Sequence, residues 1–407
     1  MKDLPTKLKC FIKLNIPFTI RTIYFTYFRA LNTTNIPIMD KPTTKQRFDY
    51  IDQFRGFVGI LMLLGHSAYY FNSIWYRLDP LDPLFPSNSQ FILRFIGYLC
   101  APGFLMMAGA MVWWSYTKRV EKGVPIRTAK WHLIQRGLFL ILMQMTWVNS
   151  SWGGFSDFRP WHFGIISSIG ISVILLTLIV GLKWQIRLFI GVVLLLIHPF
   201  LLQINYSQDA VFNTVIMQTF VDAGTFNKYP VIPWFSLAVL GSVMATGWLQ
   251  IWKSDSLKIK MSYIIGFSSI LLAIIIRLFR GYGNINSFSD FGSISFFLDQ
   301  KYPPSLFMNL LFFGLVVIGV GSFIALNKWV PKFMKLFSIP GKVPLFFYGV
   351  HLAILGVFVK RFDFFYREGE ILNTFIGLGV MLIIMFPLSK WFYNYKRKSN
   401  NPIIKMI

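Results

Sequence analysis

The sequence predicts an all-α membrane protein, a polytopic bundle of about ten transmembrane helices with both termini in the cytoplasm. Composition is the first reason, because 55% of the 407 residues are hydrophobic and 14% are charged. A soluble domain carries about 25% charged residues. The second reason is the length of the apolar stretches, and the third is the placement of the basic residues between them.

Each apolar stretch approaches the roughly 20 residues that a helix needs to cross about 30 Å of hydrocarbon. The fifth of these stretches is short. In chain order, we expect spans near Phe54–Phe71, Phe91–Tyr116, Leu133–Ser151, Trp161–Leu182, Leu188–Ile204, Val231–Trp252, Tyr263–Phe279, Ser305–Leu326, Pro344–Val359 and Ile371–Phe392.

Basic residues gather in alternate connections, where they explain most of the net charge of +24. These connections share one side of the membrane if the spans alternate, and the positive-inside rule makes that side cytoplasmic. No nucleic-acid-binding signature accompanies the charge, so we expect an anionic leaflet and no nucleic acid as its partner. The residues are Lys118, Arg119, Lys122, Arg127, Lys130, Lys183, Arg187, Lys253, Lys258, Lys260, Lys328, Lys332, Lys335, Lys342, Lys396, Arg397 and Lys398.

The connections on the other side are richer in Asp, Asn, Ser and Pro. They are Leu78–Gln90, Ser151–Pro160, Asn205–Tyr229 and Gly281–Pro304. The last two are longer than a simple connection needs. Long loops over a rigid scaffold commonly carry substrate contacts, so we expect such contacts in these loops.

Three segments follow from these observations. Residues 1–46 are apolar and aromatic but are broken by Lys and Arg, which favours a basic amphipathic segment in the inner interface. A true span within residues 9–30 is the alternative, and it would move the N-terminus outside. Residues 47–394 form the transmembrane domain, and residues 395–407 form a basic cytoplasmic tail.

The first predicted span carries two ionisable side chains, Arg55 and His66, with ten residues between them. At 1.5 Å per residue, His66 lies about 16 Å along the helix from Arg55, near the middle of the bilayer. Asp52 precedes Arg55 by three residues, so the two can pair on one helix face. An ionisable residue at this depth is a candidate functional residue. A neutral histidine that only hydrogen-bonds a neighbouring helix is the alternative.

Other polar groups in the spans are few. His351 follows Tyr348 by three residues, so both can face one cleft, although a Tyr–His hydrogen bond inside the bundle is equally compatible. His162 follows Trp161 at the outer start of the fourth span. Neither the two cysteines nor the histidines have the spacing of a metal site, and we expect no metal.

Five motifs occur in order along the chain, and they resemble those of one family. The motifs are DQFRGFVGILMLLGH (52–66), LRFIGYLCAPGFLMMAGA (93–110), YPVIPWFSLAVLGSVMATG (229–247), KYPPSL (301–306) and GKVPLFFYGVH (341–351). Together they make residues 48–392 similar to bacterial membrane proteins related to heparan-alpha-glucosaminide N-acetyltransferase. The Arg-x10-His pattern also resembles the membrane acyltransferases of surface glycans. Gly65 departs from the family, whose members often carry an acidic residue just before the histidine.

The resemblance implies an acyl-CoA-dependent, multi-pass acyltransferase of the cell inner membrane. Its donor is cytosolic acyl-CoA, acetyl-CoA in particular, and its acceptor is a hydroxyl or amine of a glycan or lipid-linked sugar on the far side. His66 acts as base or nucleophile, and His351 and Tyr348 are further acid–base groups. The residues expected at the CoA phosphates are Arg55 with its partner Asp52, Lys118, Arg119, Arg136 and Lys342, and those expected at the acceptor are Lys301, Tyr302, Trp234, Trp161 and His162.

A transporter or flippase for a lipid-linked glycan is the alternative function. A transporter of this size is expected to contain two related repeats around a central path. An acyltransferase is instead expected to have a basic inner vestibule that narrows onto His66. The sequence leaves the acceptor, the acyl chain and the oligomeric state open, and a homodimer is one assembly that it allows.

Overall fold

The computed structural model of the protein describes residues 48–77 and 87–407. The chain divides into two units, Met1–Phe48 and Asp49–Ile407. The prediction for residues 1–46, whether interfacial segment or additional span, lies outside the described residues.

The described part of the chain is all-helical, and it contains isolated β-bridges but no β-strand. Three stretches, η1 (Gln144–Val148), η2 (Gly247–Ile251) and η3 (Leu355–Arg361), are π-helical. The α-helices are α3 (Asp49–Phe71), α4 (Ser73–Arg77), α5 (Asn88–Gly97), α6 (Cys100–Glu121), α7 (Ile126–Met143), α8 (Asn149–Trp152), α9 (Ile165–Ile179), α10 (Trp184–Leu201), α11 (Val211–Phe220), α12 (Val231–Thr246), α13 (Asp255–Leu278), α14 (Ile294–Phe297), α15 (Leu306–Trp329), α16 (Pro331–Lys342), α17 (Pro344–Ile354), α18 (Ile371–Lys398) and α19 (Pro402–Met406).

Seven helical stretches among the described residues are long and apolar enough to cross a membrane. They coincide with the second and the fifth to tenth predicted spans, which confirms the fold class as a membrane helix bundle. The other three predicted spans are also helical, as α3, α7 and α9, but they fall outside this group. Ten crossings and cytoplasmic termini therefore stay a prediction.

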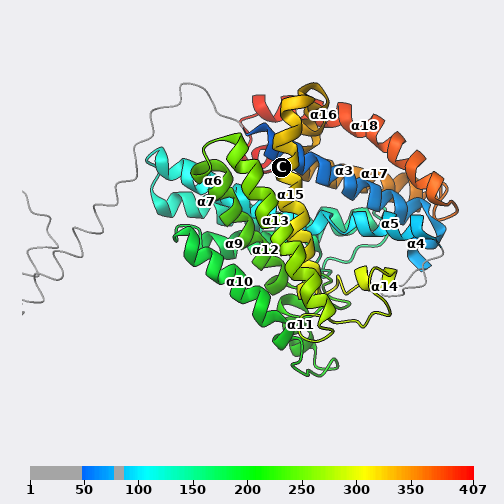
Figure 1. The fold of residues 1–407 in the computed structure, drawn as a ribbon. Coiled ribbons are helices and arrows are strands. Elements are labelled where there is room, and N and C mark those ends of the chain that lie inside the picture. Colours follow the sequence, from blue (N-terminus) through cyan, green and yellow to red (C-terminus); the bar gives the residue numbers. More distant parts are fainter. Residues whose placement is uncertain (1–47, 78–86) are drawn as a thin grey trace, which may run out of the picture. The chain divides into compact units, whose positions relative to one another are not determined.

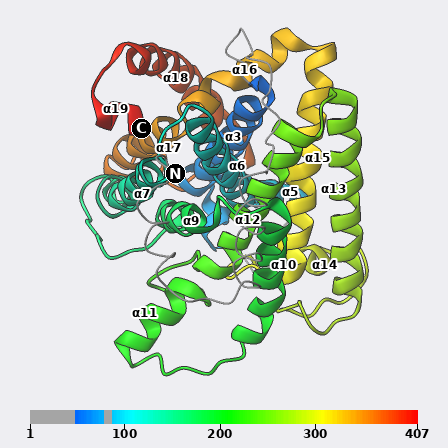
Figure 2. The ribbon, with the colours of Figure 1, turned by 90° about the vertical axis from the view of Figure 1, so that its left-hand side faces the viewer.

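The bundle is built around α3, α6 and α12. Figure 2 shows α7 and α9 on one side of these helices and the α13–α15 pair on the other. α17 and α18 also pack against α3. The first span of the sequence is therefore surrounded by helices from the whole chain, which buries most of its length.

The two ends of the bundle differ in chemistry. One end, called the α16 end, carries α16 and the start of α7, where Lys130 Nζ donates to the Leu178 carbonyl of α9 at 3.1 Å. The opposite end, called the α11 end, carries α11, α14 and the long polar connections (Figure 1). Three helices of the connections, α11, α14 and α16, were not predicted from the sequence, because each is short or amphipathic rather than uniformly apolar.

Small residues bring the central helices into backbone contact. A Cβ on Gly56 of α3 would overlap the Phe337 carbonyl of α16, and a Cβ on Gly341 would overlap the Asp52 carbonyl. The α6–α12 contact is built in the same way, with Gly109 against Ala238. Close approach at small residues is the usual basis of helix association in lipid, where tails are as apolar as leucine.

This packing predicts a large difference between two glycines of the same helix. Gly56→Ala should destabilise the protein by about 1–3 kcal/mol, because the added methyl group has no space between α3 and α16. Gly65→Ala is the matched control, since no atom lies within 4 Å of its added Cβ. Thermal unfolding of the purified protein should show a lower midpoint for the first variant alone. Equal midpoints would contradict the close contact.

Candidate active site

The two histidines of the Arg-x10-His and closing motifs meet in the interior. His66 Nδ1 and His351 Nε2 lie 2.7 Å apart, although 285 positions separate them in the sequence. α3 supplies His66, and α17, which begins at Pro344, supplies His351 two turns later. Proline suits the first turn of a helix because it needs no N–H partner there. His351 is fully buried, whereas His66 is partly exposed.

The hydrogen bonds of this pair assign the proton positions of two neutral rings. His351 Nδ1 lies 2.6 Å from the Phe347 carbonyl oxygen, and a carbonyl can only accept. His351 Nδ1 therefore carries a proton, and its Nε2 carries the lone pair. It follows that His66 Nδ1 donates to His351 and that His66 Nε2 is left as a lone pair. This nitrogen has the electronic character that a general base or a nucleophile needs.

Aromatic rings surround the pair. Trp152 of α8 lies edge-on to the His66 ring, with centroids 5.0 Å apart, and the Tyr348 ring lies at 5.8 Å. Tyr348 also contacts His351, at 5.8 Å between centroids. Tyr348 and His351, one turn apart on α17, thus lie against the same ring of α3.

A cavity of about 360 Å³ leads from the α16 end toward this pair. Its wall runs along α3 from Arg55 to Met62, and along α17 to Tyr348. Met62 lies one turn before His66 on the same face of α3. His66 does not line the cavity itself, but Tyr348 joins the two. The middle of the wall is apolar, formed among others by Phe104, Met107, Leu140, Ile166 and Val173.

The α16 end of the cavity is cationic. Arg55, Arg136, Lys342 and Lys396 line it. The charge of Arg55 acts on Arg136, and both act on Lys396, so three cations repel one another. Asp52 accepts a hydrogen bond from Arg55 at 3.3 Å, as the spacing of the two residues predicts. Among the described residues, neither Arg136 nor Lys396 makes a side-chain hydrogen bond or ion pair.

The other basic candidates lie beside this cavity in different ways. Lys342, at the end of α16, lines it and also places Nζ 5.3 Å from the Tyr393 ring. Lys118 does not line it, because its Nζ pairs with Glu121 at 2.7 Å and lies over the Trp114 ring, which does line it. No hydrogen bond, ion pair or ring contact of the described residues joins Arg119 to the cavity.

On the α11 side, the KYPPSL segment approaches the histidine pair. The charge of Lys301 acts on His66, and its Nζ lies 4.3 Å from the Tyr98 ring centroid. The hydroxyls of Tyr302 and Tyr229 are hydrogen-bonded at 3.0 Å. Burial raises the pKa of Tyr302, but the Lys301 ammonium and the Tyr229 hydroxyl lower it, and the net direction is downward. Tyr302 is therefore the more acidic hydroxyl of the two.

The remaining residues that were predicted to contact the acceptor differ in their exposure and in their distance from the histidine pair. Trp234 is buried, at 1% exposure, rather than open at an entrance, and its ring lies 5.6 Å from Tyr229. Its Nε1 has no hydrogen-bond acceptor within the described part of the protein. Trp161 is 63% exposed, and no contact among the described residues joins it or His162 to His66. Burial lowers the pKa of His162, and a hydrogen bond with the Thr225 backbone opposes that shift.

Sequence reasoning missed three residues of this region. Lys396 was expected in a cytoplasmic tail, but α18 continues to Lys398 and carries it to the cavity. Tyr229 and Trp152 lie at the ends of connections, where no periodicity marks them. A signal for Tyr229 was present, since it is the first residue of the YPVIPW motif. Residues 48–77 and 87–407 hold no group of three His, Cys, Asp or Glu side chains that could bind a metal ion.

Comparison with known proteins gives one positive result. No curated protein matches the chain. The model of the catalytic domain of heparan-alpha-glucosaminide N-acetyltransferase matches residues 47–278, which is more than half of the chain. The match includes His66, the cationic residues Arg55 and Arg136, and the YPVIPW motif, and it ends before KYPPSL and the closing motif. The chain therefore belongs to the heparan-alpha-glucosaminide N-acetyltransferase catalytic family, which makes it a membrane acetyltransferase.

Proposed function

We propose that this protein moves an acetyl group from cytosolic acetyl-CoA to an amine or hydroxyl of a glycan on the opposite side of the cell inner membrane. The observation that carries the proposal is the cavity, which begins at four cationic side chains and ends at Tyr348, beside His66. In this proposal the α16 end faces the cytosol, and the α11 end faces the acceptor.

The lining of the cavity fits acetyl-CoA as donor substrate. Arg136 and Lys396, together with Arg55 and Lys342, would meet the pyrophosphate and the 3′-phosphate, because phosphates are the natural partners of such cations. Asp52 would hold the Arg55 guanidinium in place rather than touch the donor. The apolar middle of the wall suits the pantetheine arm, whose thioester would then reach the level of Tyr348.

The His66 Nε2 lone pair allows two routes. As a general base, it takes the proton from the acceptor while the acceptor attacks the thioester carbonyl, and it returns that proton to the leaving thiolate. As a nucleophile, Nε2 attacks the carbonyl itself and expels CoA thiolate, which leaves an acetyl-imidazolium. The acceptor then attacks the acetyl carbon, the bond to Nε2 breaks and restores the lone pair, and the acceptor's proton passes to the CoA thiolate. In both routes His351 is a positioning residue, since it accepts from His66 Nδ1 and keeps Nε2 unprotonated. Acetylation of His66 without acceptor would distinguish the second route.

The acceptor would approach along the KYPPSL segment. The charge of Lys301 acts on His66, Tyr302 is the next residue, and the unpaired Nε1 of Trp234 is a further donor for a sugar oxygen. Trp161 and His162 would belong to an outer part of the path. Membership of an acetyltransferase family favours this enzyme over the transporter alternative.

The cationic α16 end of the cavity leads to a prediction about donor binding. Arg136→Gln and Lys396→Gln should each raise the KM for acetyl-CoA about tenfold or more, since each removes a charge-assisted bond to a phosphate. kcat should change little, because neither residue contacts the reacting atoms. Steady-state CoA release over a range of acetyl-CoA concentrations measures both constants.

Arg127→Gln is the matched control, because Arg127 is exposed at the same end but does not line the cavity. It should leave the KM unchanged. If all three variants raised the KM equally, general surface charge rather than the cavity would attract the donor. If none did, CoA would bind elsewhere.

A further inference from the structure

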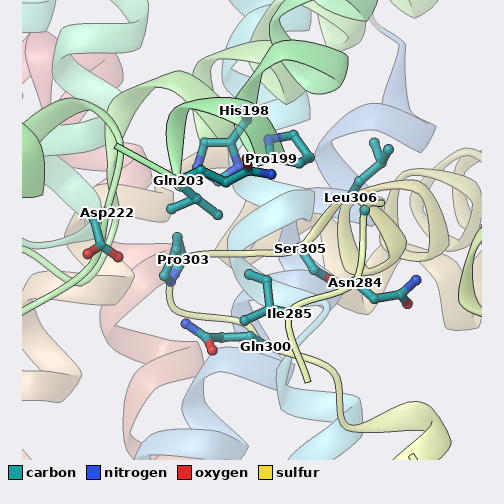
Figure 3. Close-up of a pocket in the computed structure, with 12 residues that line it drawn as sticks. His198, Pro199, Gln203, Asp222, Asn284, Ile285, Gln300, Pro303, Ser305 and Leu306 are labelled. Atoms are coloured by element: carbon teal, nitrogen blue, oxygen red, sulfur yellow. The ribbon is translucent and has the colours of Figure 1, made fainter. Parts of the chain in front are cut away.

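A second cavity, of about 320 Å³, lies at the α11 end. Three separate segments form it: the last turn of α10 with the residues after it, the connection that follows α11, and the segment between α13 and α15 (Figure 3). The volume is within the range of small-molecule sites. None of the roles discussed above uses it.

The walls of this cavity are fixed by contacts between the segments. His198 Nε2 donates to the Val221 carbonyl at 2.8 Å, which ties α10 to the end of α11. The Tyr282 hydroxyl donates to the Leu196 carbonyl, and its ring lies 5.0 Å from that of Phe200. These contacts hold the three segments together, so the cavity walls are fixed parts of the fold.

The polar groups of the cavity select a class of ligand. Neither lysine nor arginine lines it, so it offers nothing to a phosphate or sulfate. Asp222 has no cation within ion-pair distance in the described part of the chain, and it accepts only from Tyr206 at 3.1 Å and from its neighbouring N–H. The Gln203 amide is exposed and unbonded, and Gln300 Oε1 is also unbonded. Carboxylate and amide groups above apolar walls suit the hydroxyl or amino groups of a sugar.

One short segment connects this cavity with the histidine pair. Gln300, Pro303 and Ser305 line the cavity, whereas Lys301 and Tyr302, between them, face the interior beside His66 and Tyr229. The turn is closed, because Ser305 N–H donates to the Gln300 carbonyl at 3.0 Å and Gln300 Nε2 donates to the Tyr302 carbonyl at 2.8 Å. A chain of sugars that runs along this segment can therefore contact both the second cavity and the histidine pair.

We propose that this cavity is a distal sugar subsite, which binds a neutral or amino sugar next to the one that is acetylated. The inference rests on the proposed acetyl transfer at His66. The subsite gives a longer glycan more binding energy than a single sugar, without a contact to the reacting group. It therefore acts on the KM of long acceptors and not on kcat.

The test uses the full-length purified protein and two probes, glucosamine and a tetrasaccharide of glucosamine. Gln203→Trp should fill the cavity, and Gln208→Trp is the matched control, being exposed in the same connection but outside the lining. We expect Gln203→Trp to weaken the tetrasaccharide Kd, measured by calorimetry without acetyl-CoA, about tenfold or more. The control should bind as the wild type does, and kcat and KM for glucosamine should stay within about twofold for both variants.

The outcomes separate the two proposals. A wild type that does not bind the tetrasaccharide, or a Kd that Gln203→Trp leaves unchanged, overturns the subsite, whatever the acetyl-transfer assay gives. Tetrasaccharide binding that only Gln203→Trp weakens supports the subsite even if no CoA is released, and the missing CoA release then contradicts the proposed acetyl transfer alone.

Discussion

His66→Ala should lower kcat for acetyl transfer by about 10³-fold, because it removes the nitrogen lone pair that the hydrogen bonds of the histidine pair leave free to act as base or nucleophile. The donor should still bind, since His66 does not line the cationic cavity. CoA release by the purified protein, with acetyl-CoA and glucosamine supplied, measures the loss. The KM for acetyl-CoA in the residual reaction, or its Kd by calorimetry, shows that binding is retained.

Ser67→Ala is the matched control for this variant. Ser67 is the next residue of α3, and its buried hydroxyl has no hydrogen-bond partner in the described part of the protein. Its removal should leave both kcat and the unfolding midpoint close to wild type. Wild-type turnover by His66→Ala would show that the acetyl group takes another route.

The second large effect is expected at His351. His351→Phe should lower kcat about 10²-fold, because His66 Nδ1–H then loses its acceptor and the imidazole is free to adopt the other tautomer. His351→Gln should recover part of that loss, since a glutamine side-chain oxygen can accept the same hydrogen bond. The KM for acetyl-CoA should be unchanged in both variants. Steady-state CoA release supplies all four constants.

A structural role alone would give a different pattern. His351 is fully buried, so either substitution could loosen α17, and both variants would then lose thermal stability and activity together. Recovery of kcat by Gln but not by Phe, at similar unfolding midpoints, separates proton positioning from packing. Equal losses in the two variants would contradict the positioning role.

The parts of the fold that sequence reasoning reached are those that one helix encodes by itself. Seven long helices were predicted by the apolar stretch Phe91–Tyr116 and by the six stretches between Leu188 and Phe392. This was possible because hydropathy and length are local properties. The Asp52–Arg55 pair followed from helical spacing, which is also a local property.

The parts that it did not reach depend on contacts between distant segments. Gly65, directly before His66, offers no side chain that could orient the imidazole, so the sequence left the orientation of His66 unexplained. The structure supplies a partner from α17, His351, which no local pattern assigns to α3. Lys396 was hidden in a run of basic residues that is equally compatible with a solvated tail, and only the return of α18 to the cavity gives it a role.

The central claim is that donor and acceptor reach His66 from opposite ends of the bundle. Sealed proteoliposomes with uniformly oriented protein test it, with acetyl-CoA supplied only on the α16 side and glucosamine only on the α11 side. We expect acetylated glucosamine in the glucosamine compartment and CoA in the other, and neither product with His66→Ala. Product that forms only when both reactants are on the same side would contradict it.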